Sequence, residues 1–333
     1  MRRWMLAPLL MLAATSARAV DICPNVRNQQ YAADIATRIA AIACSEHMLW
    51  YRPFIDRNGR IASTAVMESE NTLLDDGASQ AWRRVAGYWQ ETGLLQQMGG
   101  SAGAGECAYA VRDRHPSPSC RAFVIDNAWS AAFVSWVLMK ARLPGFRGSA
   151  SHIDYVRAAY QRPDGNAYQF LDPTHAKPSV GDLLCYVRGG YQTLGHAGLQ
   201  AVAAAGGGLN MHCDIVVATN PGGDSTAYLI GGNVQQAVTM RLLPLNRNGE
   251  FWSLPQQIDG GSECAPDNDK ACSFNRQDWA VLLKLKSPEA LAQLAPAAPM
   301  LVPAMPQAAP QPQCCVHCVV GSGVPRCPPT GTP

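Results

Sequence analysis

The spacing of hydrophobic positions changes once along the chain, near Pro178. Before this residue, apolar side chains recur every three or four positions, which predicts amphipathic helices. The turn from Asp56 to Gly59 lies between two short apolar runs, which predicts a small hairpin. We expect helices over residues 28–46, from Asp75 to Gly93, from about Asn127 to Leu143 and from Ser151 onward, with residues 99–121 as a loop.

Beyond Pro178, short runs of β-forming residues are separated by Gly, Asn and Pro, which predicts strands. The expected strands are Asp182–Val187, Ala197–Ala203, His212–Ala218, Ala227–Gly231, Ala237–Leu243 and Trp279–Leu285. Helices followed by a run of strands are typical of an α+β fold with a mainly antiparallel sheet. We therefore expect the N-terminal helices to pack on such a sheet.

The first nineteen residues have the order of a secretory signal peptide. Arg2 and Arg3 precede a short apolar run, and the segment Ala17-Arg18-Ala19 provides the small residues after which signal peptidase cuts. The apolar run is shorter than the ~20 residues that cross a bilayer. We expect an exported protein, periplasmic or secreted, with no membrane span after signal removal.

Composition divides the rest of the chain into three parts. Residues 20–75 form a helical and hairpin extension, residues 76–287 form one α+β domain, and residues 288–333 form a tail rich in Pro and Ala that also contains cysteines. The formal charge of +2 gives no reason to expect nucleic acid as a partner. We expect no cofactor and no metal, although the tail cluster Cys314–Cys318 leaves zinc open beside disulfides.

Twelve cysteines in an exported chain favour disulfides over thiol chemistry. Two candidate pairs bracket polar loops, one spans the first helix, and one joins two strands. These are, in that order, Cys107 with Cys120, Cys264 with Cys272, Cys23 with Cys44, and Cys185 with Cys213. Spacing alone leaves other pairings open.

Ser130 is the first candidate for chemistry. It lies in the first turn of an expected helix, behind Asp126 and Asn127 as possible caps, and it shares an apolar stripe with Phe133 and Val137. Its hydroxyl therefore points toward the surface on which the helix packs, which we expect to be the sheet. Free N–H groups at a helix start can stabilise an oxyanion. A serine at this position is also a common helix cap.

The second candidate group lies on two expected strands. His212 and Asp214 share one face of their strand, because side chains alternate, and Cys213 points to the other. Asn233 closes a later strand after Gly231-Gly232, where it could orient an imidazole. Asp214 is open to two interpretations, a third member of the site or a polar edge residue.

Four segments, WSAAFVSW, PSVGDLLC, HCDIVV and IGGNVQQAVTMRLLPL, resemble the bacterial domain of unknown function family 2272. That family is similar to the NlpC and CHAP groups of papain-like cell-wall peptidases and amidases. The resemblance covers about residues 80–250. It implies a papain-like fold, in which a nucleophile at a helix start meets a histidine at a strand start and a polar residue on the next strand.

Carried over by position, the resemblance implies Ser130 as nucleophile, His212 as base and Asn233 as the group that orients the ring. The relatives use a cysteine thiolate, whereas a serine must lose its proton to the base during attack. His196, within Gly195-His196-Ala197-Gly198, is the competing base, since relatives often carry a similar motif there. The residues expected at the substrate cleft are Trp129, Ser151 and His152.

The sequence therefore predicts an exported hydrolase of amide or ester bonds, with peptidoglycan or another peptide or glycan as substrate. The alternative is a papain-like module that has lost catalysis and binds cell wall or a protein partner. A secreted, toxin-like effector is a third interpretation. Turnover by the unmodified protein would separate the first from the second.

Overall fold

The computed structural model describes residues 21–110, 117–189, 193–251, 254–257 and 264–301. The expected signal peptide, most of the tail and the tail cysteines lie outside these residues. All described residues belong to one compact unit that ends at Leu301. The predicted extension over residues 20–75 is thus part of the same unit as the α+β region.

An eight-stranded sheet forms the centre of this unit, in the order β2-β1-β7-β6-β5-β4-β8-β3. All its strand pairs are antiparallel except β1 with β7, so the sheet is mixed and the α+β prediction is confirmed. The expected hairpin at residues 56–59 is confirmed as β1 and β2, which extend the main sheet. The strands are β1 Phe54–Ile55, β2 Ile61–Ala62, β3 Tyr168–Leu171, β4 Leu183–Val187, β5 Met211–Thr219, β6 Thr226–Val234, β7 Ala237–Pro244 and β8 Asp278–Leu285.

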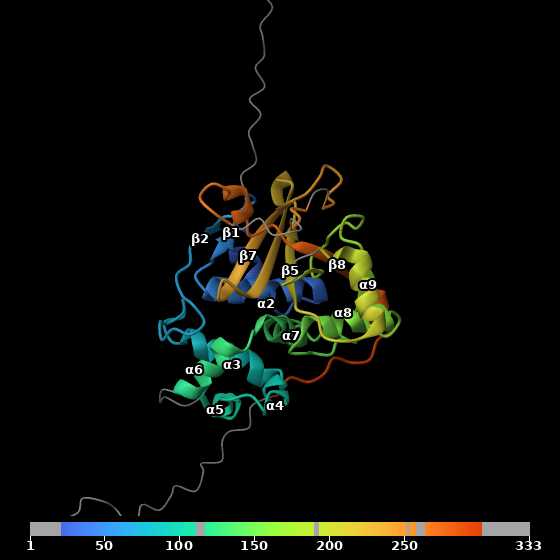
Figure 1. The fold of residues 1–333 in the computed structure, drawn as a ribbon. Helices are drawn as coiled ribbons and strands as arrows, with labels where there is room; N and C mark the ends of the chain where they lie inside the picture. Colours follow the sequence, from blue (N-terminus) through green and yellow to red (C-terminus); the bar gives the residue numbers. More distant parts are fainter. Residues whose placement is uncertain (1–20, 111–116, 190–192, 252–253, 258–263, 302–333) are drawn as a thin grey trace, which may run out of the picture. The chain divides into compact units, whose positions relative to one another are not determined.

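Helices from both halves of the chain cover the sheet. In Figure 1, α2, α7 and α8 lie below the strands, α9 lies beside β8, and α3 to α6 form a group farther from the sheet. Both α2 and α7 contact β5 and β6, and α9 contacts β8. The longer helices are α2 Ile35–Leu49, α3 Ala81–Glu91, α6 Pro118–Asp126, α7 Ser130–Lys140, α8 His152–Gln161 and α9 Gly195–Ala205; the short ones are α1 Cys23–Val26, α4 Leu94–Gln97, α5 Ala104–Ala110 and α10 Pro288–Leu291.

Several expected elements are corrected by the structure. The segment Ala197–Ala203 is helical, within α9, and its alanines are strong helix formers. Residues 99–121 are not simply a loop, because they contain α5 and the start of α6. The second helix begins at Ala81 and not directly after Asp75 and Asp76. The Asp76 carboxylate accepts from the Ser79 N–H at 2.8 Å, which closes a turn before the helix. β3 was not predicted from the sequence.

Four disulfides connect these elements, and they are the four candidate pairs. Cys185 and Cys213 lie directly opposite each other on β4 and β5, which share an antiparallel register. The other three are Cys23–Cys44, Cys107–Cys120 and Cys264–Cys272. Disulfides of this number are typical of proteins in an oxidising compartment.

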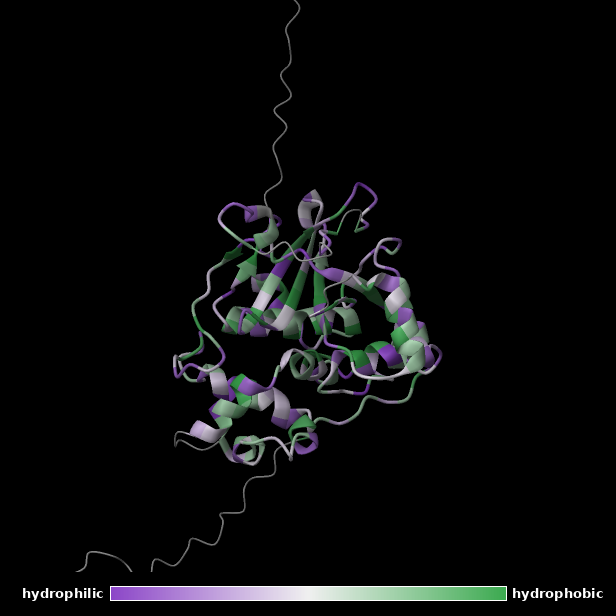
Figure 2. Cartoon of the chain, in the orientation of Figure 1, coloured by the Kyte–Doolittle hydropathy of each residue, from purple (hydrophilic) through white to green (hydrophobic). Residues whose placement is uncertain are grey.

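Most of the hydrophobic core lies between the sheet and the helices, where the strands in Figure 2 are predominantly hydrophobic. Trp129 is fully buried in it, stacked between Trp50 and Tyr88 at centroid separations of 5.8 and 5.7 Å. In the described residues, no single helix has the length and hydrophobicity to span a bilayer; α6 and α7 meet these criteria jointly, but they are bent by 96° at their junction.

Candidate active site

Ser130 is the first residue of α7, and it is 4% exposed. Trp129 is the N-cap residue and contributes no side-chain cap, and the first helical backbone bond joins the Phe133 N–H to the Trp129 carbonyl. The N–H groups of Ser130 and Ala131 therefore have no partner within the helix. The serine hydroxyl and these donors lie at the same end of one helix, as a nucleophile and an oxyanion site require.

The hydrogen-bond partner of Ser130 is His152, at the start of α8. Its Nε2 lies 2.8 Å from Ser130 Oγ, and its Nδ1 is hydrogen-bonded to the hydroxyl of Tyr155, one turn along the same helix. Burial lowers the pKa of His152 well below 6.5, and His212 lowers it further, so the ring is neutral at pH 7. When the Nδ1–H donates to Tyr155, the lone pair on Nε2 faces the serine hydroxyl.

His212 does not occupy the position that the resemblance implies. Its Nε2 lies 2.7 Å from Asp214 Oδ1, which follows from the shared strand face predicted for these two residues. Its ring centroid lies 5.3 Å from that of His152, with the planes inclined by 53°. The assignment of His212 as the direct partner of Ser130 is therefore corrected: His152, predicted as a cleft residue, makes this contact.

Behind His212 is a buried ion pair. Asp214 Oδ2 accepts from Arg241 Nε at 2.8 Å, and both side chains are almost completely buried. Burial alone would raise the pKa of Asp214, but His212 and Arg241 outweigh it and hold this pKa well below its usual range. Asp214 thus carries a fixed negative charge near the two histidines.

The Gly231-Gly232-Asn233 run has a different role from the one implied. With its amide oriented to satisfy both partners, Asn233 donates to Glu68 Oε2 at 2.9 Å and accepts from the Trp129 N–H at 3.2 Å, so it holds the start of α7 instead of an imidazole. A Cβ at Gly231 would lie 1.9 Å from Asp214 Oδ1. The glycine therefore leaves the room that the His212–Asp214 pair needs.

Glu68 lies before the predicted α+β domain and still reaches the start of α7. Its Oε2 accepts from Trp129 Nε1 at 2.6 Å, and its backbone N–H donates to the Gln236 carbonyl at 2.8 Å. Burial raises the pKa of Glu68, although the bond from Trp129 opposes this. Trp129 is fully buried in the core, and its indole N–H is already bonded to Glu68. Its prediction as a substrate contact is therefore contradicted.

A cavity of about 450 Å³ opens onto the Ser130–His152 pair. Ser151 and His152, both predicted at the cleft, line it, and Arg188 is the charged side chain on its described walls. The full lining is Ala128, Ser130, Ala131, Ala150, Ser151, His152, Arg188, Gly189, Leu209, Asn210 and Met211. Within the described part of the chain, no cluster of three His, Cys, Asp or Glu side chains is arranged to hold a metal ion.

The competing base, His196, lies on α9, away from the Ser130 cavity. Its Nδ1 is 2.8 Å from the Ala280 carbonyl oxygen, and its ring packs on Phe170 at a centroid separation of 5.1 Å. These contacts join α9 to β8 and β3. His196 is therefore a packing residue of that helix and does not line the Ser130 cavity.

Sequence reasoning missed four residues of the site: Glu68, Tyr155, Arg188 and Arg241. Tyr155 follows His152 by three positions on a helix, a spacing that places both side chains on one face and could have revealed it. Arg241 carries the one charge in an otherwise uncharged and largely hydrophobic strand, which is a signal for a buried partner. Arg188 follows β4 with no such signal.

The fold and the site define an α+β protein with a buried serine–histidine pair at a helix start, facing a cavity. Residues 76–285 match the family described as "Uncharacterized protein conserved in bacteria (DUF2272)", and the chain belongs to this family. The predicted membership is thereby confirmed. No curated protein and no solved structure gives a significant match.

Proposed function

We propose that this protein is an exported hydrolase of amide or ester bonds, with a papain-like arrangement of helix and sheet and a peptide of peptidoglycan as its substrate. The observation that carries the proposal is the 2.8 Å contact between Ser130 Oγ and His152 Nε2 at an uncapped helix start. The disulfides support an oxidising location. The resemblance to NlpC and CHAP hydrolases supports the substrate class.

In this mechanism Ser130 Oγ attacks the carbonyl carbon while its proton passes to His152 Nε2. The tetrahedral oxyanion is held by the N–H groups of Ser130 and Ala131. His152 then gives the proton to the leaving nitrogen or oxygen as the acyl bond breaks. Water then attacks the carbonyl carbon of the acyl-serine while its proton passes to His152 Nε2. The ester bond breaks, the proton returns to Ser130 Oγ, and the acid product leaves.

His212 and Asp214 act through His152 in this scheme. Burial and His212 lower the pKa of His152, and the negative charge of Asp214 raises it in part. Asp214 therefore favours the imidazolium that forms during attack, whereas His212 opposes it. Tyr155 keeps its proton, because burial raises its pKa well above 10, and it can accept the Nδ1–H bond in both states. Tyr155 is thus a positioning residue for the base.

The cavity also supports a preference among substrates. Arg188 is an exposed residue on the wall of the cavity. Its positive charge is near enough to the reacting groups to lower the pKa of His152. A peptide with a carboxylate beside the scissile bond would complement this charge. Stem peptides of peptidoglycan offer such carboxylates.

Purified mature protein, incubated with peptidoglycan sacculi and with small ester substrates, tests the proposal. Ser130→Ala and His152→Ala should each abolish release of product; the loss of a general base alone corresponds to ~10²–10⁴-fold. His196→Ala is the matched control, a histidine outside the cavity, and should keep its activity. Equal turnover by wild type, Ser130→Ala and His152→Ala would exclude the catalytic assignment.

A binding module without turnover is the second candidate, and the 4% exposure of Ser130 favours it, since a substrate carbonyl needs access to the hydroxyl. Ser130→Cys distinguishes the two functions. Thiol-dependent turnover in this variant, with none in wild type, would identify an intact cleft whose serine is silent. Turnover by wild type identifies a working serine.

A further inference from the structure

A second cavity, of about 290 Å³, lies beside the start of β1 and shares no lining residue with the Ser130 cavity. One part of its wall is aromatic or aliphatic, and the other is polar. The lining consists of Asp21, His47, Tyr51, Arg52, Phe54, Ser63, Tyr228, Met240 and Leu242. Residues before the family-matched segment supply six of these nine, from Asp21 to Ser63.

His47 lines this cavity and has a buried ring nitrogen without a hydrogen-bond partner among the described residues. Its Nε2 lies 3.0 Å from the Pro53 carbonyl oxygen, which can only accept, so Nε2 carries the hydrogen. Nδ1 is then a lone-pair acceptor, and it is buried without a partner among the described residues. Burial lowers the pKa of His47 to about 4, so the ring is neutral and this acceptor stays free at pH 7. Buried polar atoms normally have partners, so an unmatched one points to a ligand that donates.

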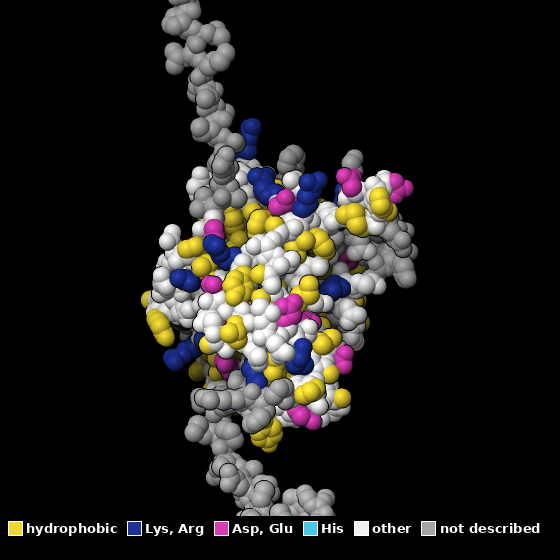
Figure 3. All heavy atoms as spheres, turned by 90° about the vertical axis from the view of Figure 1, so that its left-hand side faces the viewer, with side chains coloured by type: hydrophobic (Ala, Val, Ile, Leu, Met, Phe, Trp, Pro, Cys, Tyr) yellow, Lys and Arg dark blue, Asp and Glu magenta, His cyan; other side chains and the backbone are white. Residues whose placement is uncertain are grey.

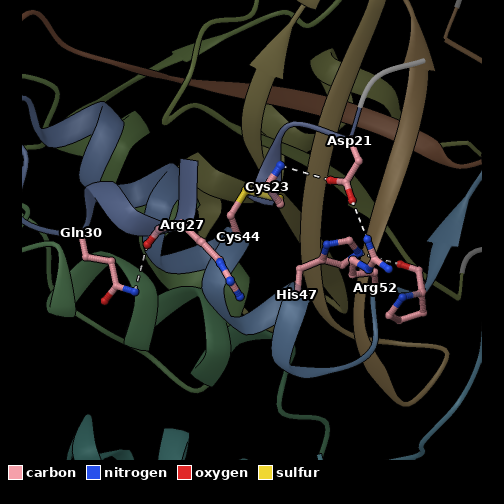
Figure 4. Close-up of a disulfide and its surroundings, with 8 residues drawn as sticks. Asp21, Cys23, Arg27, Gln30, Cys44, His47 and Arg52 are labelled. Atoms are coloured by element: carbon pink, nitrogen blue, oxygen red, sulfur yellow. Dashed lines mark hydrogen bonds and ion pairs between the residues drawn. A yellow bond between two sulfur atoms is a disulfide. The ribbon is translucent and has the colours of Figure 1, made fainter. Parts of the chain in front are cut away.

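Two charged groups stand at the rim of the same cavity. Arg52 Nη1 lies 3.4 Å from Asp21 Oδ2, and the two side chains are 55% and 39% exposed. Asp21 also accepts from the Cys23 N–H at 3.1 Å, and the Cys23–Cys44 disulfide attaches this segment to α2, as Figure 4 shows. The rim therefore offers both an acceptor and a donor, held beside His47.

The backbone at the rim is strained. Tyr51 and Arg52 are consecutive non-glycine residues with φ of 63° and 59°, a region that L side chains rarely adopt. Such strain is found preferentially at functional sites. On the face of the molecule that carries β1 and β2, Figure 3 shows basic and acidic side chains interspersed with hydrophobic ones, and no histidine is visible among the described residues there.

We propose that this cavity binds a single saccharide ring. The apolar C–H face of a sugar packs on Tyr51 and Phe54, while one hydroxyl donates to His47 Nδ1. Neighbouring hydroxyls replace the Asp21–Arg52 contact, donating to the carboxylate and accepting from the guanidinium. The volume lies near the lower limit for small-molecule sites, which fits one ring. The site is independent of the proposed hydrolase and does not require Ser130.

The test is a titration of the mature wild-type protein, disulfides intact, with N-acetylglucosamine and with glucose, followed by ¹⁵N NMR of the histidine rings. Saturable binding of either sugar should shift His47 Nδ1 upfield, as expected when an unbonded imidazole nitrogen accepts a hydrogen bond, and should leave His196 unmoved. Arg52→Ala should weaken binding about tenfold, which corresponds to ~1.4 kcal/mol. Arg188→Ala, an arginine at the other cavity, is the matched control and should bind like wild type.

Three results would overturn the proposal: no saturable binding of either sugar by wild type, binding that leaves the His47 signal unchanged, or equal affinity in Arg52→Ala. Ser130→Ala should bind sugar as wild type does, whether or not wild type hydrolyses any substrate. Failure of the saccharide site is therefore measured separately from failure of the hydrolase proposal.

Discussion

The buried ion pair between Asp214 and Arg241 gives a prediction whose magnitude follows from the structure. Arg241→Met keeps much of the side-chain volume and removes the charge, so the buried Asp214 carboxylate retains His212 as its donor but loses its cation. Removing one partner of a buried pair costs ~3–5 kcal/mol of unfolding free energy. At ~2–4 °C per kcal/mol, the melting temperature should fall by roughly 6–20 °C.

The same pair determines how stability depends on acid. The folded pKa of Asp214 is depressed below the usual ~3.9, so the unfolded chain binds this proton more tightly than the folded one. The stabilisation is complete well above pH 4, begins to fall as the unfolded chain takes up the proton near pH 4, and is fully lost only below the depressed folded value. Asp214→Asn removes this titration and should flatten that part of the acid limb, at the cost of lower stability at pH 7.

Equilibrium unfolding in urea, with disulfides oxidised, measures both effects between pH 7 and pH 3. Arg188→Met is the control, because this arginine is exposed and its loss should change stability by no more than ~0.5 kcal/mol. If Arg241→Met were as stable as wild type and kept the same acid limb, the carboxylate would not be charged and paired as described.

Three further predictions concern the site and its supports. If His152 is the base, kcat/KM should stay level from pH 8 to below pH 6.5, because burial lowers the pKa of His152 and the neutral ring is the active form. A fall of kcat/KM with a midpoint at pH 7 or above would contradict this. Gly231→Ala should lower the melting temperature and abolish turnover, since its Cβ would meet the Asp214 carboxylate, whereas Gly105→Ala, with open space around it, should do neither. Glu68→Ala should cost ~1–3 kcal/mol in urea unfolding by leaving buried donors unpaired, and Glu68→Gln should recover most of it, because a single oxygen of Glu68 accepts both bonds.

Local patterns predicted most of the sheet, because β-forming runs and turn residues are adjacent in the sequence. The prediction failed at Ala197–Ala203, where the length of the apolar run suits a strand but alanine favours a helix. β3 was missed because it is a short edge strand whose pairing with β8 depends on residues more than a hundred positions away. Long-range pairing of this kind leaves no local signal.

Ser130 and the His212–Asp214 contact could be predicted, since both depend on positions within one element. The contact between Ser130 and His152 could not, because it spans 22 residues and depends on how α8 packs beside α7. Asn233 was placed on the correct strand, but its partners are the Glu68 carboxylate and the Trp129 N–H. Glu68 lies outside the motifs from which the site was inferred.

The hairpin of β1 and β2 has a consequence for where this module can be cut. β1 covers the edge of β7, and Trp50 and Glu68 enclose Trp129 from the same part of the chain. A fragment restricted to residues 76–285 would expose a bare strand edge and a tryptophan, both of which promote aggregation. The smallest portion that can be transplanted intact therefore includes Trp50 and β1, well upstream of the boundary drawn by sequence likeness.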